Sequence, residues 1–229
     1  ISNGVDSTAL FSGFTITGDD ESRSIYIENV NGVSLEDLYL TISKGISVES
    51  SEINIDNTKF YNNSYSGGPL VQINNSDVGM SNCLVDSNYA HMIISIINSN
   101  AEFDGNLFLR NYGDNGCING TSSSISIESS TFIDNYRPIN LNNGSFYCNN
   151  STFTNNNGNN GGALEVRSNQ SVTIINSHFN NNYATVGGGL YLYNNENLSL
   201  TNTSVIGNTA MFNGGGIFIY PSYGQISNF

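Results

Sequence analysis

The chain has 229 residues, of which 19 are acidic and 6 are basic, so its net charge is −13 at pH 7. Such a charge repels polyanions and argues against nucleic-acid binding, and no apolar run approaches the roughly 20 residues needed to span a bilayer. Charged residues make up 11% of the chain, against about 25% in a typical globular protein, and because good helix formers are few, helix is expected to be a minor element at most.

Short alternations of apolar and polar residues recur along the chain, which is typical of strands with one buried face. They form two sets, one on each side of a recurring aromatic or aliphatic residue. In chain order, the pairs that precede this residue are Ile53/Ile55, Val78/Met80, Ala101/Phe103, Ile125/Ile127, Phe146/Cys148, Val172/Ile174 and Leu198/Leu200.

The second set of alternating pairs follows the recurring residue. Its members are Ile46/Val48, Val71/Ile73, Ile94/Ile96, Ile139/Leu141, Leu164/Val166, Leu190/Leu192 and Ile217/Ile219. After Phe108 the pattern is less regular, and either Cys117 or Ile118 is a candidate for the inward position.

The recurring residue itself is Leu40, Phe60, Val85, Phe108, Phe132, Phe153, Phe179 or Val205, at intervals of 20 to 26 residues. Three residues after Leu40 stands Ser43, but the other seven are followed at the same distance by an asparagine. These asparagines are Asn63, Asn88, Asn111, Asn135, Asn156, Asn182 and Asn208. Each repeat therefore predicts three short strands, the third of which carries the Phe-x-x-Asn motif.

Repeats of this length and content predict an all-β fold, a single-stranded parallel β-helix of about nine coils that spans residues 1–229 as one domain. At about 4.8 Å per coil the rod would be roughly 43 Å long. A leucine-rich repeat is the alternative, but the sequence lacks its L-x-x-L-x-L spacing and any helical arm. Stacking would align the phenylalanines in the core and let the asparagines pass amide hydrogen bonds between coils. A weaker asparagine column is Asn57, Asn82, Asn150, Asn176 and Asn202, interrupted by Gly105 and Ser129.

Pairs of glycines precede several of the strands, at GGAL (161–164), GGGL (187–190) and GGGI (214–217). Together with five literal FxxN tetrapeptides, at 60–63, 108–111, 132–135, 153–156 and 179–182, they resemble the GGA[ILV]/FxxN repeat of chlamydial polymorphic membrane proteins and related protist surface proteins. The resemblance implies a right-handed β-helix that is secreted or surface-displayed and works in adhesion or as a stalk. The SGFTITG stretch (12–18) is similar to the opening coil of pectin-lyase-like β-helices.

Catalysis would require clustered carboxylates, often with Ca²⁺ and a basic residue. The basic residues are scattered, at Arg23, Lys44, Lys59, Arg110, Arg137 and Arg167. Arg110 lies near Asp86 and Asp134 in the repeat alignment, which favours a surface ion pair. His91 and His178 are too far apart in the repeat to share a metal, and GDDES (18–22) is interpreted as a solvated acidic loop. The sequence therefore predicts no catalytic, cofactor-binding or metal-binding residues, and a protein that is not an enzyme.

The three cysteines are assigned a structural role, and the role of a row of aromatic residues is left open between three alternatives. Cys83, Cys117 and Cys148 are expected to be buried free thiols, since Cys83 and Cys148 are too many coils apart for a disulfide. Outward-facing aromatic residues follow one another at Tyr191, Tyr193, Phe218 and Tyr220. They are consistent with a carbohydrate-stacking face, a self-association patch or support between neighbouring strands.

Nine N-x-[ST] sequons occur, close to the number expected by chance from this composition. Five of them, Asn74, Asn119, Asn143, Asn169 and Asn197, are assigned to the loop between the second set of strands and the next coil, which predicts a glycan-bearing edge. Asn150 and Asn202 lie in the weaker asparagine column and are expected to be unmodified.

The preferred function is a non-enzymatic, extracellular or cell-surface rod that is structural or adhesive. It would be one segment of a fibre assembled end to end, with itself or surface glycans as partners, because uncapped β-helix ends expose strand edges. The final YGQISNF (223–229) is expected to begin a further strand. The alternatives are a carbohydrate-binding β-helix and a polysaccharide lyase or hydrolase.

Overall fold

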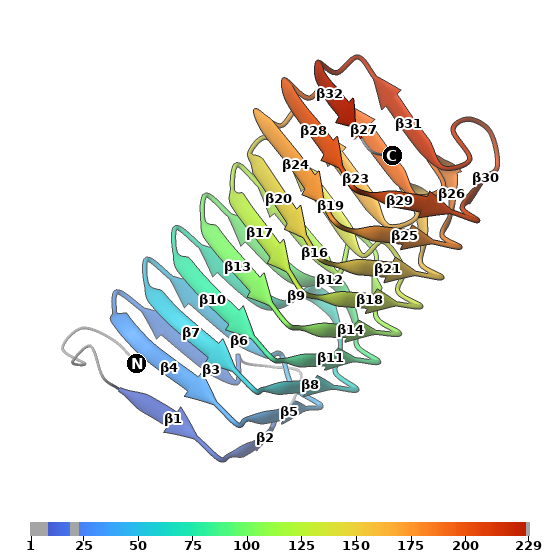
Figure 1. Cartoon of the computed structure of the whole chain (residues 1–229). Coiled ribbons are helices and arrows are strands. Elements are labelled where there is room, and N and C mark those ends of the chain that lie inside the picture. Colours follow the sequence, from blue (N-terminus) through green and yellow to red (C-terminus); the bar gives the residue numbers. More distant parts are fainter. Residues whose placement is uncertain (1–8, 19–22, 228–229) are drawn as a thin grey trace.

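The computed structural model describes residues 9–18 and 23–227, which form a rod of stacked coils (Figure 1). All strand pairings in these residues are parallel, and the described chain contains strands and turns but no helix. It follows that no helix among them has the length and apolarity that a membrane crossing needs. Most of the acidic stretch at 18–22 lies outside the described residues.

Three long sheets run the length of the rod, and the chain visits them in the same order in every coil. Sheet A contains β1 (Leu10–Ser12), β4 (Asn31–Glu36), β7 (Glu52–Asp56), β10 (Asp77–Ser81), β13 (Asn100–Asp104), β17 (Ser124–Glu128), β20 (Ser145–Asn149), β24 (Ser171–Ile175), β28 (Asn197–Thr201) and β32 (Gly224–Ser227). The expected strand within the final segment is β32.

Sheet B carries the recurring aromatic or aliphatic residue at the centre of each strand. It contains β2 (Thr15–Thr17), β5 (Tyr39–Thr41), β8 (Lys59–Tyr61), β11 (Leu84–Asp86), β14 (Leu107–Leu109), β18 (Thr131–Ile133), β21 (Thr152–Thr154), β25 (His178–Asn180) and β29 (Ser204–Ile206). Nine strands in this sheet correspond to nine coils, so the predicted parallel β-helix is confirmed.

Sheet C closes each coil and leads into sheet A of the next. It contains β3 (Ile25–Glu28), β6 (Ile46–Glu49), β9 (Ser64–Asn74), β12 (Tyr89–Ile97), β16 (Ile118–Thr121), β19 (Ile139–Asn142), β23 (Leu164–Arg167), β27 (Leu190–Tyr193) and β31 (Ile217–Tyr220), with β15 (Tyr112–Gly113) paired to β12. A small fourth sheet of β22 (Asn157–Asn160), β26 (Tyr183–Val186) and β30 (Thr209–Ala210) was not predicted.

The core is formed by the inward residues of all three sheets, aligned in register from coil to coil. In sheet A, for example, Val78 lies between Ile53 and Ala101. Beyond the irregular turn after Phe108, Ile118 takes the inward position in register with Ile94 and Ile139, and Cys117 is buried just before the strand. Because like residues stack on like residues, each coil buries its apolar side chains against its two neighbours.

Each corner of the coil is made by one residue with left-handed backbone geometry, with φ between 44° and 78°. Between sheets A and B (the A–B corner) these residues are Gly13, Asp37, Asn57, Asn82, Gly105, Ser129, Asn150, Asn176 and Asn202. The corner between sheets B and C (the B–C corner) and that between sheets C and A (the C–A corner) each have a column of eight. Asparagine, aspartate and glycine tolerate this geometry best, which accounts for much of the composition.

The weaker asparagine column lies at the A–B corner. Its members, Asn57, Asn82, Asn150, Asn176 and Asn202, are exposed left-handed residues, and Nδ2 of Asn202 donates to Oδ1 of Asn176 at 3.3 Å. The residue that follows each of them points inward and is small and polar in most coils, as at Thr58, Ser151 and Ser177.

The two glycines of the GG motif have separate physical roles. The first, as in Gly161, Gly187 and Gly214, has φ of 63° to 65°, where glycine avoids steric strain. The second lies against the backbone of the next coil: a Cβ on Gly162 would be 2.2 Å from the carbonyl oxygen of Gly188. Both glycines are therefore needed at Gly161–Gly162 and at Gly187–Gly188, where a side chain would meet neighbouring backbone atoms.

Coil length varies mainly at one corner. From the buried residue of the A–B corner to that of the B–C corner, the chain takes the same number of residues in every coil, for example at 58–63, 130–135 and 177–182. From the B–C corner to the inward residue that heads the register of sheet C, the chain is short in one coil (135–139) and long in another (182–190). The variable spacing of the sequence repeat therefore arises largely at the start of sheet C.

Candidate functional site

The asparagines of the FxxN motif form a continuous buried ladder at the B–C corner. In the middle of it, Oδ1 of Asn135 accepts the backbone N–H and the Nδ2–H of Asn111, at 2.9 and 3.0 Å. Nδ2 of Asn135 donates to the carbonyl of Phe108 and to Oδ1 of Asn156. The same contacts repeat through the set Asn63, Asn88, Asn111, Asn135, Asn156, Asn182 and Asn208. Ser43 begins the ladder by donating to Oδ1 of Asn63.

The phenylalanines of the motif stack in the core beside this ladder. Ring centroids of Phe108 and Phe132 are 4.6 Å apart, as are those of Phe132 and Phe153, and each pair is within 7° of parallel. Phe153 and Phe179 are 4.8 Å apart, and Phe60 is buried in the same column. Val85 separates Phe60 from Phe108, so the aromatic stack itself starts at Phe108.

The other two corners also carry buried polar ladders, which the sequence pattern did not reveal. At the A–B corner the backbone N–H of Asn106 donates to Oγ of Ser130, and that of Ser130 to Oγ of Ser151. At the C–A corner the N–H of Ser76 donates to Oγ of Ser99. At most of these corners the backbone N–H that follows the left-handed residue is thus accepted by a polar side chain of the next coil.

The five sequon asparagines lie near the C–A corner, but they are not all in the loop to which the sequence assigned them. Asn74 ends β9, Asn119 lies within β16 and Asn197 begins β28. Asn143 is an exposed left-handed corner residue, whereas Asn169 follows such a residue and is only 1% exposed. Oδ1 of Asn169 accepts the N–H of Gly144, as part of the C–A corner ladder. Spacing in the sequence was too coarse to separate a corner residue from its inward neighbour.

The cysteines are buried free thiols, as predicted. Burial raises the pKa of Cys83 and of Cys148 to about 12 and raises that of Cys117 as well, so all three remain protonated at neutral pH. His178 is exposed in β25. No group of three or more His, Cys, Asp or Glu residues in the described part of the chain is placed to hold a metal ion.

Arg110 forms the expected ion pair on the surface of sheet B. Its Nη2 donates to both carboxylate oxygens of Asp86, at 2.7 and 2.9 Å. Asp134 instead occupies the same left-handed corner column as Arg110. Because more than half of the Arg110 side chain is exposed, the pair is worth at most about 1 kcal/mol.

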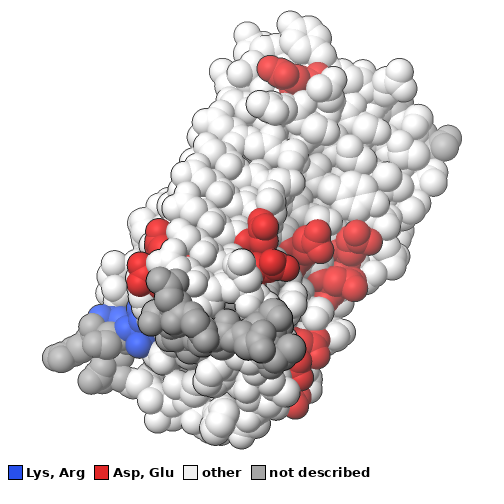
Figure 2. All heavy atoms as spheres, turned by 90° about the vertical axis from the view of Figure 1, so that its left-hand side faces the viewer, with Lys and Arg blue, Asp and Glu red and all other residues white. Residues whose placement is uncertain are grey.

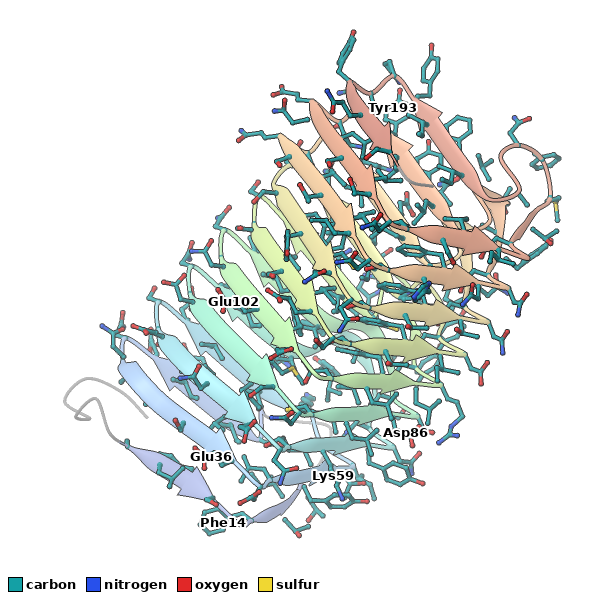
Figure 3. The ribbon with its side chains drawn as sticks, in the orientation of Figure 1. Phe14, Glu36, Lys59, Asp86, Glu102 and Tyr193 are labelled. Carbon is teal, nitrogen blue, oxygen red and sulfur yellow. The ribbon has the colours of Figure 1, made fainter. Side chains whose placement is uncertain are left out.

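Acidic side chains gather on the outer face of sheet A, in the coils near the N-terminal end. Glu52, Asp77 and Glu102 line a groove of about 420 Å³, and Nδ2 of Asn100 donates to Asp77. Glu36 and Glu102 stand on this face in Figure 3, and Figure 2 shows acidic residues clustered over the side where sheet C passes into sheet A. The strand register brings them together although they are far apart in sequence.

Most of the basic residues lie beside sheet C. Arg23 donates to the carbonyls of Lys44, Pro69 and Leu70 and to the side chain of Gln72, so it is committed to holding the chain over this sheet. The ammonium of Lys44 lies 4.9 Å from the ring centroid of Tyr65. Arg137 and Arg167 lie further along the rod.

Arg137 and Arg167 flank a buried carboxylate on the outer face of sheet C. Nε of Arg167 donates to Oε1 of Glu165 at 2.6 Å, and Nη2 of Arg137 donates to Oε2 at 3.1 Å. The Glu165 side chain is only 5% exposed. The Arg167 guanidinium also lies over the rings of Tyr191 and Tyr193, 4.8 and 5.8 Å from their centroids. Sequence reasoning missed this cluster, although Glu165 and Arg167 are two residues apart on one strand face.

The outward aromatic residues beyond Arg167 form a ladder whose ring faces cover one another. Tyr191 stacks on Phe218 with centroids 5.0 Å apart and an angle of 9°, and Tyr193 lies 6.0 Å from Tyr220. Tyr193 is among the last coils in Figure 3. Because the faces of Tyr191 and Phe218 are turned toward each other, this geometry favours support between neighbouring strands over a sugar-stacking platform.

Comparisons with known proteins show little likeness to this chain. No protein-family model matches it, and no curated protein matches it, so the resemblance to the GGA[ILV]/FxxN proteins rests on the motif alone. Among solved structures, PfbA, a surface adhesin of Streptococcus pneumoniae, is 9% identical, with a TM-score of 0.25 over 98% of this chain and 75% of that one. A mutant of the alginate lyase AlyGC, of family PL6, is 10% identical, with a TM-score of 0.27 over 93% of this chain and 50% of that one.

Proposed function

We propose that the chain is a non-enzymatic rod that acts in structure or adhesion at a cell surface. The observation that carries this proposal is the asparagine ladder, which runs without a break from Ser43 to Asn208. Such a ladder couples the backbones of successive coils from Ser43 to Asn208, and shorter runs of polar contacts add to it at the other two corners. A rod fastened at three corners is suited to hold a binding surface away from its point of attachment.

The GGA[ILV]/FxxN pattern adds a second argument, from resemblance. In the proteins that it resembles, the repeat belongs to surface-displayed adhesins or stalks, and an extracellular location for this chain follows from the same resemblance. The three buried thiols are compatible with either redox compartment, since burial keeps them from reacting.

Self-association through the ends is the preferred assembly. Phe11 in the first described coil and Ile219 in the last stand in inward columns, in register with the buried Leu35 and Leu192, yet each is 38% exposed. A further coil, from the same chain or from another copy, would bury these side chains and pair the open strands. We propose that another copy does so, which produces a fibre.

Electron microscopy of the purified protein in negative stain, at increasing concentrations, tests the rod and the fibre separately. We expect rods one coil wide at low concentration and longer fibres of the same width as the concentration rises. Short rods of constant length at every concentration would remove end-to-end assembly and leave the rod intact. Compact particles would contradict the structural function itself.

If the protein is made in a cell that glycosylates sequons, Asn143 is the best acceptor of the five. It is exposed, whereas the side-chain amides of Asn74, Asn119 and Asn197 donate to neighbouring groups and Asn169 is buried. We expect mass spectrometry of peptides from secreted protein to find glycan at Asn143 and none at Asn169. The Asn169 sequon is an internal control, and a glycan there would contradict the buried corner ladder.

Carbohydrate binding is the second candidate function, and the arginine cluster on sheet C favours it. Arg137 and Arg167 are the two bases nearest the outer face of the later coils, and both are oriented by Glu165. A rod that binds glycans would serve adhesion without any catalysis. The two functions therefore differ in ligand rather than in architecture.

A further inference from the structure

The Arg167 side chain is held in one conformation by several contacts, although it lies at the surface. Its Nε is held by Glu165, and its guanidinium plane lies over Tyr191 and Tyr193 in the next coil. The side chain is nevertheless 35% exposed. Among the described residues, neither Nη atom of Arg167 has a hydrogen-bond partner. An arginine with its plane fixed and its two terminal nitrogens free presents a ready fork for an oxyanion.

Stability alone does not explain why a carboxylate is buried beside Arg167. Glu165 shares its column in sheet C with Asn140 in the preceding coil and Tyr191 in the following one, both of which are neutral. Burying an ion pair often stabilises a protein less than a packed neutral side chain of similar size. Two arginines also exceed the charge of one carboxylate, so the cluster keeps a net positive charge on a protein with a total of −13.

We propose that Arg167 is the anion-binding element of a site for an acidic polysaccharide on the outer face of sheet C. The ligand group is a carboxylate or a sulfate, held by the two free Nη atoms. Glu165 is a positioning residue, because it fixes the guanidinium without touching the ligand. This inference rests on the adhesive form of the proposed function and names the chemical class of its ligand.

The side chains in line with Arg167 suit a hydroxyl-rich chain laid along the rod. In strand register the row contains Thr121, Asn142, Arg167, Tyr193 and Tyr220, which offer hydroxyls, an amide and phenols. Since the ring faces in the neighbouring column are already stacked, sugars would be held here by hydrogen bonds and charge.

An acidic peptide fits this surface less well than a saccharide. Extended peptides usually gain affinity by adding a strand to an open sheet edge. In sheet C, β23 already pairs with β19 on one side and with β27 on the other, so no free edge faces Arg167. The acidic groove lies on sheet A, and the acidic residues in the row of Arg167, Glu28 and Glu49, are at least five coils away from it. At about 0.1 M salt their field is screened within about 10 Å.

The test compares Arg167→Gln with Arg110→Gln, which removes the same charge from a pair on sheet B. Binding of three probes is measured by calorimetry in about 0.1 M salt: polygalacturonate for carboxylates, heparin for sulfates, and dextran as a neutral polymer. We expect one or both acidic probes to bind the wild type, and Arg167→Gln to weaken binding by roughly 10- to 100-fold, as the loss of two charge-assisted hydrogen bonds implies. Arg110→Gln should bind as the wild type does, and dextran should not bind.

Arg167→Lys is a second variant, which distinguishes loss of the binding site from a folding defect in Arg167→Gln. It keeps the charge beside Glu165 but lacks the planar fork, so we expect intact stability and binding weakened at least several-fold. Four results would overturn the site. The first is an equal loss of binding in Arg167→Gln and Arg110→Gln, and the second is undiminished binding by Arg167→Lys. The other two are binding of dextran as tight as that of the acidic probes, and no binding of either acidic probe. None of these results would change the rods expected in electron microscopy. Cleavage products in the probe solutions would instead contradict the non-enzymatic function while leaving the site in place.

Discussion

Replacing Phe132 by alanine should lower the free energy of unfolding by about 3–5 kcal/mol, the usual cost of deleting a buried aromatic ring. Phe132 is fully buried and lies between Phe108 and Phe153, each 4.6 Å away between ring centroids. Its removal leaves a cavity between two rings that belong to other coils, so both neighbours lose their stacking partner. The measurement is urea denaturation followed by circular dichroism, with the shift of the midpoint as the result.

Tyr183→Ala is the matched control for this experiment. Tyr183 is an aromatic residue in β26 that is 40% exposed, and its replacement should cost no more than about 1 kcal/mol. A Phe132→Ala protein as stable as Tyr183→Ala would mean that the phenylalanine column does not support the core. In that case the asparagine ladder would be the main link between coils.

Replacing Asn135 by leucine should lower the free energy of unfolding by about 2–5 kcal/mol, although leucine has the same number and branching of side-chain heavy atoms. The substitution removes the acceptor for the backbone N–H of Asn111 and the donor to the carbonyl of Phe108, both of which are buried. A buried polar group that loses its partner costs about 1–3 kcal/mol. Urea denaturation again provides the measurement.

Asn142→Leu makes the same chemical change at an exposed position of β19 and should alter the free energy of unfolding by no more than about 0.5 kcal/mol. If the two leucine variants unfold at the same urea concentration, the asparagine ladder follows from the fold without stabilising it. A large loss in Asn135→Leu alone would show that amide hydrogen bonds between coils contribute to the stability of the rod.

Much of the fold could be predicted from the sequence because the repeat has two independent periods. Alternation identifies the inward residues of sheets A and C, and the Phe-x-x-Asn spacing identifies sheet B together with the corner that follows. Because each inward position recurs in every coil, a chance match in one coil does not change the predicted pattern. Three strands per coil and nine coils follow from this redundancy.

The corners and outer faces were harder to predict, because they depend on exact position rather than on average pattern. Asn143 is the exposed corner residue of its coil, and buried Asn169 stands one position further on in the next coil. The sequon pattern is the same at both positions, so it does not distinguish them. The cluster of Arg137, Glu165 and Arg167 crosses two coils, so it becomes visible only when the strand register is known. Long side chains that meet between coils leave no periodic signal.

The variable length of the chain between the B–C corner and sheet C has a practical consequence. All three ladders keep their spacing while this segment changes from coil to coil, so the fold tolerates insertions there. A foreign peptide spliced into this segment in successive coils would be presented as a column of copies, one above another at intervals of about 4.8 Å. The rod could therefore display inserted groups along one edge, at a spacing set by the hydrogen-bonded backbone of the stacked coils.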